Sequence, residues 1–279
     1  MIYDLHNDML TAANAEIITK ALAEYETDRP CGIIFAIWTT CLSNEDKKLN
    51  RYSLPSVPYD ARLAIEDLGG LISHDIREIL ERMRPVYVSL TWNGENALAG
   101  GCGSDSGLTG AGITAVKHIA ESGAALDLSH LSDKSFFQAL DCATACRCTV
   151  MVSHSASRAL ADHPRCITDE MAKLLAAAGG IIGVAAVPNF LDDKLQYGET
   201  CHRSRYADHI IHLCEVTSVD NVAIGTDFFG TEYYPDGLRR YSDFEFLRYD
   251  LNKRGLSDKD IDAIFCGNVK KFLQFRSRI

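Results

Sequence analysis

Residues 180–186 read Gly-Ile-Ile-Gly-Val-Ala-Ala, an apolar run without a single polar position. A strand with one face in water alternates apolar and polar side chains, whereas a parallel strand covered on both faces has no reason to alternate. The run therefore predicts a buried parallel strand. Seven more short runs of apolar and β-branched residues recur along the chain, at residues 2–6, 32–39, 62–66, 86–92, 124–130, 149–154 and 222–227.

Segments between these runs carry apolar residues three and four positions apart, which is the spacing of one helix face. Several begin at a residue whose side-chain oxygen can cap a helix, namely Thr109, Ser132, Thr168 and Ser257. Gly123 stands where the first of these helices should end. The chain therefore alternates predicted strands with predicted helices.

Eight strands and their helices, at intervals of roughly 25–40 residues, predict an α/β fold of the (β/α)8 TIM-barrel type. We expect one domain over residues 1–279. The competing fold is an open doubly wound sheet. Such a sheet typically has a glycine-rich turn after its first strand, and this sequence has none there. Residues 41–59 are polar and hold Pro55 and Pro58, so we expect a loop or a degenerate helix there.

Composition narrows the class of protein. The 28 basic and 38 acidic residues give a net charge of −10, and 47% of the residues are apolar. Disordered chains have fewer apolar residues, and nucleic-acid binders need a basic surface. The acidic charge also disfavours docking on an anionic membrane. We expect neither nucleic acid nor membrane as a partner.

The chain has ten cysteines and begins without a basic, apolar leader. We therefore predict a cytoplasmic protein with reduced thiols rather than disulfides. Cys142, Cys146 and Cys148 form the one tight cluster, and their spacing matches no zinc motif. Thiol redox chemistry at this cluster is an alternative function that only the spacing of the three cysteines supports.

Acidic and imidazole side chains stand at the carboxyl ends of five predicted strands: His6, Asp8, Glu66, His130, His154 and Asp227. Any one of them could be a capping or core-edge residue. In a (β/α)8 barrel, however, the carboxyl ends of all strands form one rim, and active sites lie there. Three imidazoles and three carboxylates at one rim suit a binuclear zinc site, or less often manganese, iron or cobalt.

Nine stretches run through nearly the whole chain in the order found in one known family: residues 4–8, 63–66, 88–93, 123–133, 152–156, 164–169, 179–183, 222–227 and 267–268. On these stretches the chain resembles the renal (membrane) dipeptidases of the amidohydrolase superfamily, as a short bacterial-type member. The resemblance implies a (β/α)8 barrel with two Zn²⁺ ions, although other divalent metals are open. It implies that His6 and Asp8 bind the first ion, that Glu66 bridges, and that His130 and His154 bind the second.

The resemblance also implies that Arg165 grips the substrate carboxylate and that Asp227 handles the proton. One position departs from the family pattern, because many members carry His where this chain has Trp92. Trp92 either contacts the substrate or only lines the pocket wall. Asn93 and Asn96 are candidate oxyanion donors near it.

The resulting hypothesis is a zinc metallo-dipeptidase that hydrolyses short dipeptides, including those with a D-residue at the C-terminal position. Another small amide or a lactone as substrate, and a non-catalytic metal- or peptide-binding relative, stay open. The expected partner is the dipeptide itself, and the resemblance suggests a homodimer. The remaining histidines are expected to lie away from the site: His74, His118, His163, His202, His209 and His212.

Overall fold

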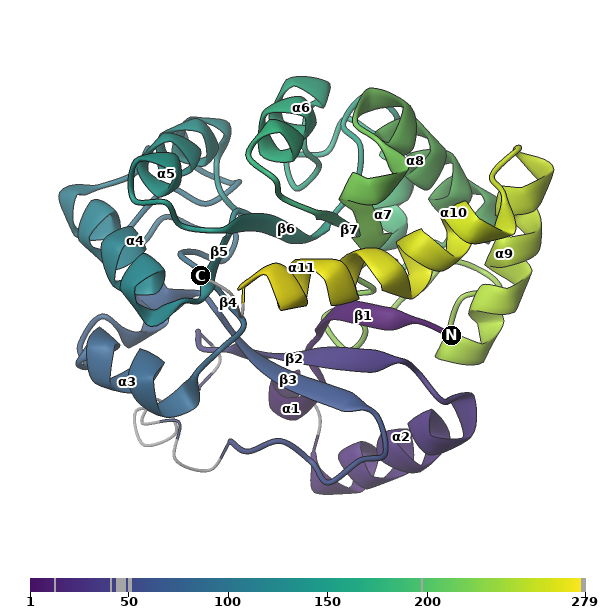
Figure 1. Cartoon of the computed structure of the whole chain (residues 1–279), viewed down its shortest axis with the longest axis horizontal. Helices are drawn as coiled ribbons and strands as arrows, with labels where there is room; N and C mark the ends of the chain where they lie inside the picture. The colour runs from purple at the N-terminus through teal and green to yellow at the C-terminus, as the bar shows by residue number, and fades with distance from the viewer. Residues whose placement is uncertain (13, 41, 44–48, 50–51, 197, 277–279) are drawn as a thin grey trace.

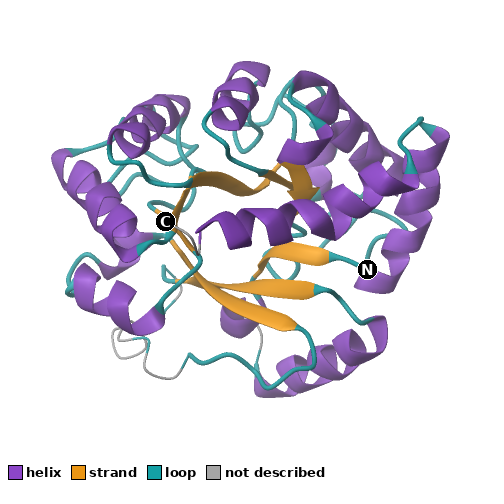
Figure 2. Ribbon diagram, in the orientation of Figure 1, coloured by secondary structure: helices purple, strands orange, loops and turns teal. Residues whose placement is uncertain are grey.

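Eight parallel strands close into a barrel in the computed structural model of this chain, with the hydrogen-bonded order β1-β2-β3-β4-β5-β6-β7-β8. The structure describes residues 1–12, 14–40, 42–43, 49, 52–196 and 198–276. Helices surround the strands, as Figure 2 shows. The predicted (β/α)8 fold is confirmed. Because β8 pairs with β1, for example Ile224 with Asp4, the sheet has no open edges and the doubly wound alternative is wrong.

Each of the eight predicted runs overlaps a strand, although β1, β3 and β6 extend one or two residues beyond the predicted bounds. The strands are β1 Tyr3–Asn7, β2 Gly32–Trp38, β3 Asp60–Glu66, β4 Tyr87–Ser89, β5 Ala125–Asp127, β6 Val150–Ser155, β7 Ile182–Val184 and β8 Val222–Ile224. Four of them are only three residues long, because the apolar runs continue past the last ladder hydrogen bonds into the loops that carry the rim residues.

The helices follow the strands around the barrel (Figure 1). The α-helices are α1 Met9–Ala12, α2 Ala15–Asp28, α3 Ile76–Met83, α4 Gly110–Ser122, α5 Asp133–Ala145, α6 Asp169–Ala177, α7 Pro188–Leu191, α8 Arg203–Val216, α9 Phe244–Lys253, α10 Asp258–Asp262 and α11 Asn268–Arg276. Short 3-10 turns lie at η2 Leu68–Leu71, η3 Val219–Asn221 and η4 Tyr241–Asp243, and a π-helical turn, η5, lies at Ala263–Gly267.

The predicted helix signals are confirmed at the atomic level. The hydroxyl oxygens of Thr109, Ser132 and Thr168 each accept a hydrogen bond from a backbone N–H three residues on. Ser257 forms a reciprocal capping box with Asp260. Each such cap stabilises a helix by about 1 kcal/mol, which is why cap residues mark helix starts so reliably.

One end of the barrel is closed by the last helix. Side chains from the strands, among them Tyr3, Tyr87 and Met151, form a buried apolar layer with Val269 and Phe272 of α11. These strand residues lie at or near the amino ends of their strands, and Figure 1 shows α11 crossing that region of the barrel. The carboxyl ends of the strands are left for the site.

The described part of residues 41–59 contains no helix, so the loop expectation holds there, while residues 41, 44–48 and 50–51 lie outside the described residues. Within the described ranges, no helix combines the length and the apolar character that crossing a membrane requires.

Candidate metal centre

The six rim residues predicted from the sequence meet at the carboxyl end of the barrel. His6 and His154 belong to β1 and β6, and Glu66 is the last residue of β3. Asp8, His130 and Asp227 lie in the turns after β1, β5 and β8. None of the six is more than 8% exposed. The strand ends therefore place three imidazoles and three carboxylates at one buried point.

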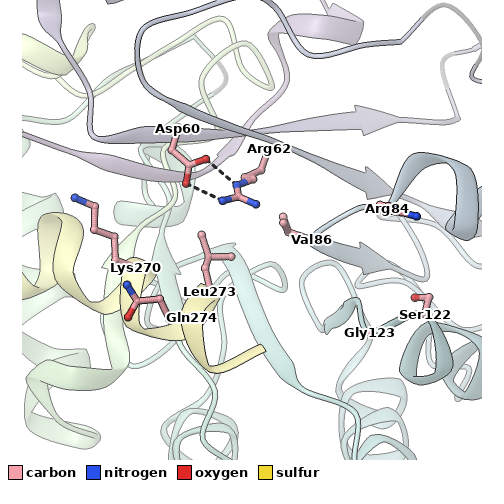
Figure 3. A pocket seen from close by; sticks show the side chains of 9 residues that line it. All are labelled: Asp60, Arg62, Arg84, Val86, Ser122, Gly123, Lys270, Leu273 and Gln274. Carbon is pink, nitrogen blue, oxygen red and sulfur yellow. Dashed lines mark hydrogen bonds and ion pairs between the residues drawn. The ribbon is translucent and has the colours of Figure 1, made fainter. Parts of the chain in front are cut away.

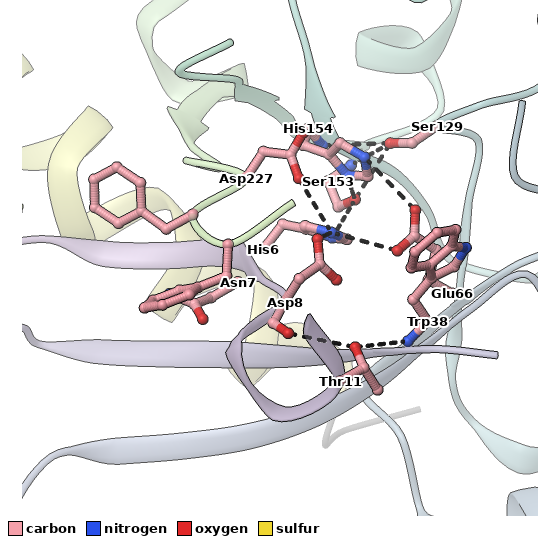
Figure 4. Close-up of polar contacts among 12 residues, drawn as sticks. His6, Asn7, Asp8, Thr11, Trp38, Glu66, Ser129, Ser153, His154 and Asp227 are labelled. Atoms are coloured by element: carbon pink, nitrogen blue, oxygen red, sulfur yellow. Dashed lines mark hydrogen bonds and ion pairs between the residues drawn. The ribbon is translucent and has the colours of Figure 1, made fainter. Parts of the chain in front are cut away.

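The Glu66 carboxylate lies between the imidazoles. Its Oε1 atom is 2.7 Å from Nε2 of His130 and 4.0 Å from Nε2 of His154. Its other oxygen, Oε2, is 3.8 Å from Nε2 of His6. Figure 4 shows Glu66 facing His6 across the centre of the rim. One carboxylate thus lies close to imidazole nitrogens on both of its sides.

His6 has two more acidic neighbours. Its Nε2 atom lies 3.2 Å from Oδ2 of Asp8 and 3.8 Å from Oδ1 of Asp227. The ligand atoms fall into three overlapping triads whose members all lie within 4.8 Å of one another. These triads are His6–Asp8–Glu66, Glu66–His130–His154 and His6–His154–Asp227.

A hydrogen bond to the far nitrogen orients each imidazole. The Nδ1 atom of His6 is 2.8 Å from the Tyr87 hydroxyl, which itself donates to the Leu5 carbonyl at 3.0 Å. The Tyr87 oxygen therefore accepts from His6 Nδ1–H. This hydrogen bond directs Nε2 of His6 at the rim centre, where that nitrogen can hold either a proton or a metal ion.

The other two imidazoles follow the same rule. Nδ1 of His130 is 2.8 Å from the amide oxygen of Asn93, which can only accept. Nδ1 of His154 is 2.7 Å from the Ser153 hydroxyl, and that hydroxyl donates to Asp127 at 2.5 Å. Both rings therefore present an Nε2 lone pair inward, and these two Nε2 atoms are 2.8 Å apart.

Burial and mutual charge shift the pKa values of the titratable side chains at the centre. Burial, followed by the neighbouring Asp8 carboxylate, raises the pKa of Glu66 well above its usual range. Burial also raises the pKa of Asp227 to about 7. Although burial lowers the pKa of His6, the charges of Asp8, Glu66 and Asp227 raise it to about 10. The three clustered carboxylates thus favour binding of a cation, either a proton or a metal ion, at the centre.

These observations fit a divalent metal. Asp8 Oδ1 is buried without a hydrogen-bond partner among the described residues, so a carboxylate oxygen stands ready as a ligand. Burial holds the pKa values of His130 and His154 well below the usual value, so both rings are neutral, as metal ligands must be. Imidazole and carboxylate together are the donor set of zinc and related transition metals.

The backbone at the rim is unusual. His130 and Asp227 have φ of 69° and 61°, in the left-handed region that non-glycine residues rarely adopt. A Cβ atom at Gly230 would collide with carboxylate oxygens of Asp227 and Asp8. Strained residues of this kind cluster at functional sites, where the surrounding structure holds them in place.

A cavity of about 440 Å³ opens onto the centre. Its walls are aromatic: Trp38 and Trp92 pack with ring centroids 5.0 Å apart, and Phe190 and Phe229 also line it. A cavity of this size suits a small molecule rather than a folded chain.

Arg165 lies in this cavity and is only 5% exposed. Its Nη2 atom is 3.1 Å from Nε2 of His130 and 3.3 Å from the His154 carbonyl oxygen. Its Nε is buried without a hydrogen-bond partner among the described residues, and the guanidinium lies 5.2 Å from the Phe190 ring centroid. The cavity thus holds one cation with unused donor capacity beside the acidic centre.

Three other residues named from the sequence lie in or near the cavity, and not all of them lie where the sequence predicts. His163, expected away from the site, lines the cavity and packs against Phe190, with the two ring centroids 4.9 Å apart. Its closeness depends on the path of the loop after β6, which no local pattern reveals. Asn93 lines the cavity, but Asn96 does not, because its amide bonds Asp67 and the Leu90 carbonyl instead. The guess that Asn96 serves as an oxyanion donor is therefore wrong.

Residues 77–275 match the family model of the membrane dipeptidases, peptidase family M19. The chain belongs to this family. Dipeptidase 3 of Rattus norvegicus is 32% identical over 164 residues, which are 59% of this chain and 32% of that protein. Dipeptidase ataJ of Aspergillus terreus is 36% identical over 154 residues, or 54% of this chain and 36% of that protein. The chain spans less than half the length of these relatives.

Solved structures support the fold of this family member. An amidohydrolase from Pseudomonas aeruginosa superposes with a TM-score of 0.81 at 20% identity, covering 99% of this chain and 96% of that one. A metallo peptidase from Rhodobacter sphaeroides, liganded with a phosphinate mimic of the dipeptide L-Ala-D-Ala, gives 0.79 at 16% identity with 98% of both chains covered. At such identities the likeness shows the barrel alone.

Proposed function

We propose that this protein hydrolyses the peptide bond of dipeptides with the help of two Zn²⁺ ions. The observation that carries the proposal is the Glu66 carboxylate, which faces His6 on one side and His130 and His154 on the other. Membership of the membrane dipeptidase family agrees with that geometry.

The proposed ligands divide into two sets. His6 and Asp8 would hold one ion, His130 and His154 would hold the other, and Glu66 would belong to both sets. When bound, such a pair of ions would supply a hydroxide nucleophile at neutral pH and Lewis-acid polarisation of the scissile carbonyl. The hydrogen bonds that the three rings donate to Tyr87, Asn93 and Ser153 hold them in the required tautomer.

Asp227 is the proposed proton carrier. Its Oδ1 atom points at the centre, 3.8 Å from Nε2 of His6, and burial raises its pKa to about 7. A carboxyl group that titrates near neutral pH can take a proton from water and release it to a departing amine. This matches the two proton transfers that peptide hydrolysis needs.

Arg165 is the proposed anchor of the substrate. A guanidinium group binds a carboxylate through two parallel hydrogen bonds and so fixes its orientation. Because the Nη2 atom of Arg165 lies only 3.1 Å from Nε2 of His130, a substrate whose carboxylate binds Arg165 must be short to place its amide bond at the centre, which favours dipeptides. Because the Rhodobacter relative holds an L-Ala-D-Ala mimic, dipeptides with a C-terminal D-residue belong among the substrates to be tested.

Trp92 shapes the side-chain preference in this proposal. It lies between Trp38 and His130, with centroid distances of 5.0 and 6.3 Å, and is 39% exposed. An aromatic wall of this kind offers apolar contact to a substrate side chain. Trp92→Ala should therefore raise KM for bulky dipeptides more than for Ala-Ala, while the bound zinc stays unchanged.

The deciding experiment measures amine release from a panel of LL- and LD-dipeptides by zinc-loaded protein. Release that a chelator abolishes and zinc restores supports the proposal. Zinc-loaded protein that leaves every dipeptide intact would direct the search to other small amides and lactones. Protein that binds neither zinc nor another divalent ion would exclude the catalytic proposal altogether.

A further inference from the structure

Two cysteine thiols meet at the end of the barrel opposite the metal centre. Cys31 directly precedes β2, and Cys266 lies in the π-helical turn η5 that leads into α11. The two thiols lie within reach of each other, although they come from distant parts of the sequence. Both pack against the apolar layer that α11 closes.

A cation stands beside this pair. Lys270 stands near the start of α11, one turn after Cys266, and its charge acts on both thiols. The interaction with Cys266, together with the nearby charge of Lys270, outweighs burial and lowers the pKa of Cys31 to about 6. A thiolate is the form of cysteine that reacts with oxidants, and such electropositive surroundings favour it.

Small molecules can reach the pair. A surface cavity of about 790 Å³ lies at this end of the barrel, lined among others by Val86, Leu273 and Lys270. Val86 and Leu273 pack against the same apolar layer as the two cysteines, and both cysteines are only partly buried. Figure 3 shows Lys270 and Leu273 of α11 across this cavity from Val86 and from the Asp60–Arg62 ion pair.

The backbone around Cys31 is fixed. Its N–H donates to the carbonyl of Ile2, the residue before β1, at 2.6 Å, and its carbonyl accepts from the N–H of Asp60, the first residue of β3, at 3.4 Å. Cys266 sits in a π-helical turn, a rare conformation that often marks functional positions. The contact between the two thiols is therefore part of the folded architecture.

We propose that Cys31 and Cys266 form a reversible disulfide when the protein meets a peroxide. The disulfide would tie α11 to the start of β2 and so lock the closed end of the barrel. This modification site is separate from the metal centre and does not depend on the proposed dipeptidase activity.

The chemistry balances in two steps. The Cys31 thiolate attacks one oxygen of hydrogen peroxide, which breaks the O–O bond, oxidises the sulfur to a sulfenic acid and releases hydroxide, which a proton converts to water. The Cys266 sulfur then attacks the Cys31 sulfur, and the hydroxyl group leaves as a second water with the Cys266 proton. Two thiols and one peroxide become one disulfide and two waters.

Another thiol pair provides a matched control. Cys142 in α5 and Cys146 at the C-cap of that helix stand one turn apart, and their thiols also interact. Here, however, burial raises the pKa of the Cys142 thiol, with Cys146 adding to that effect. The two thiols are close together in both pairs, but of Cys31 and Cys142 it is only Cys31 whose pKa is lowered. Selective oxidation of Cys31 and Cys266 is the expected distinction.

The test treats the full-length protein with one equivalent of hydrogen peroxide at pH 7. Remaining thiols are alkylated with N-ethylmaleimide, and the protein is digested without reduction for mass spectrometry. We expect a crosslinked peptide that joins Cys31 to Cys266 and disappears on reduction, while Cys142 and Cys146 stay alkylated. Alkylated Cys31 and Cys266 after this treatment, or Cys31 overoxidised without a crosslink, would overturn the proposal.

Two variants test the order of events. Cys266→Ser should stop the reaction at the sulfenic acid, so that dimedone labels Cys31, whereas Cys31→Ser should give no dimedone adduct at Cys266.

The role of the neighbouring cation is tested separately. Lys270→Gln should slow the oxidation about tenfold, and Lys270→Arg should restore the rate. Dimedone labelling of Cys266 instead of Cys31, or oxidation of Lys270→Gln at the wild-type rate, would contradict the assigned roles.

Discussion

The Nε2 atoms of His130 and His154 face each other at 2.8 Å, and the Nδ1 atoms of both rings are held by oxygen acceptors. Two neutral imidazoles in these tautomers direct two lone pairs at one point. Lone pairs repel each other at this distance, and a shared cation removes the repulsion. Metal binding should therefore stabilise the fold as well as serve the chemistry.

Zinc should raise the melting temperature. Zinc at 1,000 times its Kd stabilises the folded state by about 4 kcal/mol, which is a shift of roughly 8–16 °C for a chain of this size. His154→Ala should lose one of two bound zinc ions per chain, as counted by plasma mass spectrometry after dialysis. The matched control is His212→Ala, whose ring pairs with Asp169 on the surface. Equal zinc content in wild type and His154→Ala would rule out His154 as a ligand.

Asp227→Asn should leave the zinc content intact and reduce kcat by about 10²- to 10⁴-fold, because the amide cannot carry the proton. The substitution keeps the size of the side chain, so steady-state kinetics with a good dipeptide measures the lost proton transfer alone. Asp220→Asn, at an exposed position, should behave as wild type. Turnover within threefold of wild type in Asp227→Asn would remove Asp227 from the mechanism.

Arg165→Lys should raise KM for dipeptides by about 10- to 100-fold, since lysine cannot form the bidentate pair with a carboxylate. A dipeptide whose C-terminal carboxylate is replaced by an amide separates this role from a structural one. Wild type should prefer the free acid over the amide, and Arg165→Lys should lose most of that preference. A variant that still discriminates fully between acid and amide would place the carboxylate elsewhere in the cavity.

The sequence predicted the parts of this protein that depend on local rules. A cap such as Thr109 acts within three residues, so its pattern is visible in the chain, and its helix begins where expected. The rim residues were predictable because a strand run, such as 149–154, ends in a chemically distinct residue, His154. The barrel topology then brings such ends together without further information.

Contacts between distant segments were not predictable. Tyr87 orients His6 from another strand, and Asn93 reaches His130 only because the loop after β4 folds over the rim. The Cys31–Cys266 contact joins the two ends of the chain and has no local signature. These pairings are set by the path of loops and the closure of the barrel, and such features leave no periodic trace in a sequence.

His209 should make the fold sensitive to acid. Its ring is fully buried, with Nδ1 accepting from the Ser157 N–H at 3.0 Å and Nε2–H donating to the Leu191 carbonyl at 3.1 Å. Burial lowers its pKa from the usual 6.5 to about 4. As pH falls, the unfolded chain therefore takes up this proton first. The stability that neutral His209 confers is complete above pH 6.5 and is lost progressively down to pH 4.

Between pH 7 and pH 5 this linkage should cost about 2 kcal/mol of unfolding free energy. In His209→Asn the amide oxygen can still accept from Ser157 but does not titrate, so the variant should be less stable at pH 7 yet lose about 2 kcal/mol less on acidification. Urea unfolding at the two pH values gives both numbers. His74→Asn, which lies away from this contact, should keep the wild-type loss. An equal loss in wild type and His209→Asn would show that the acid sensitivity arises at other groups.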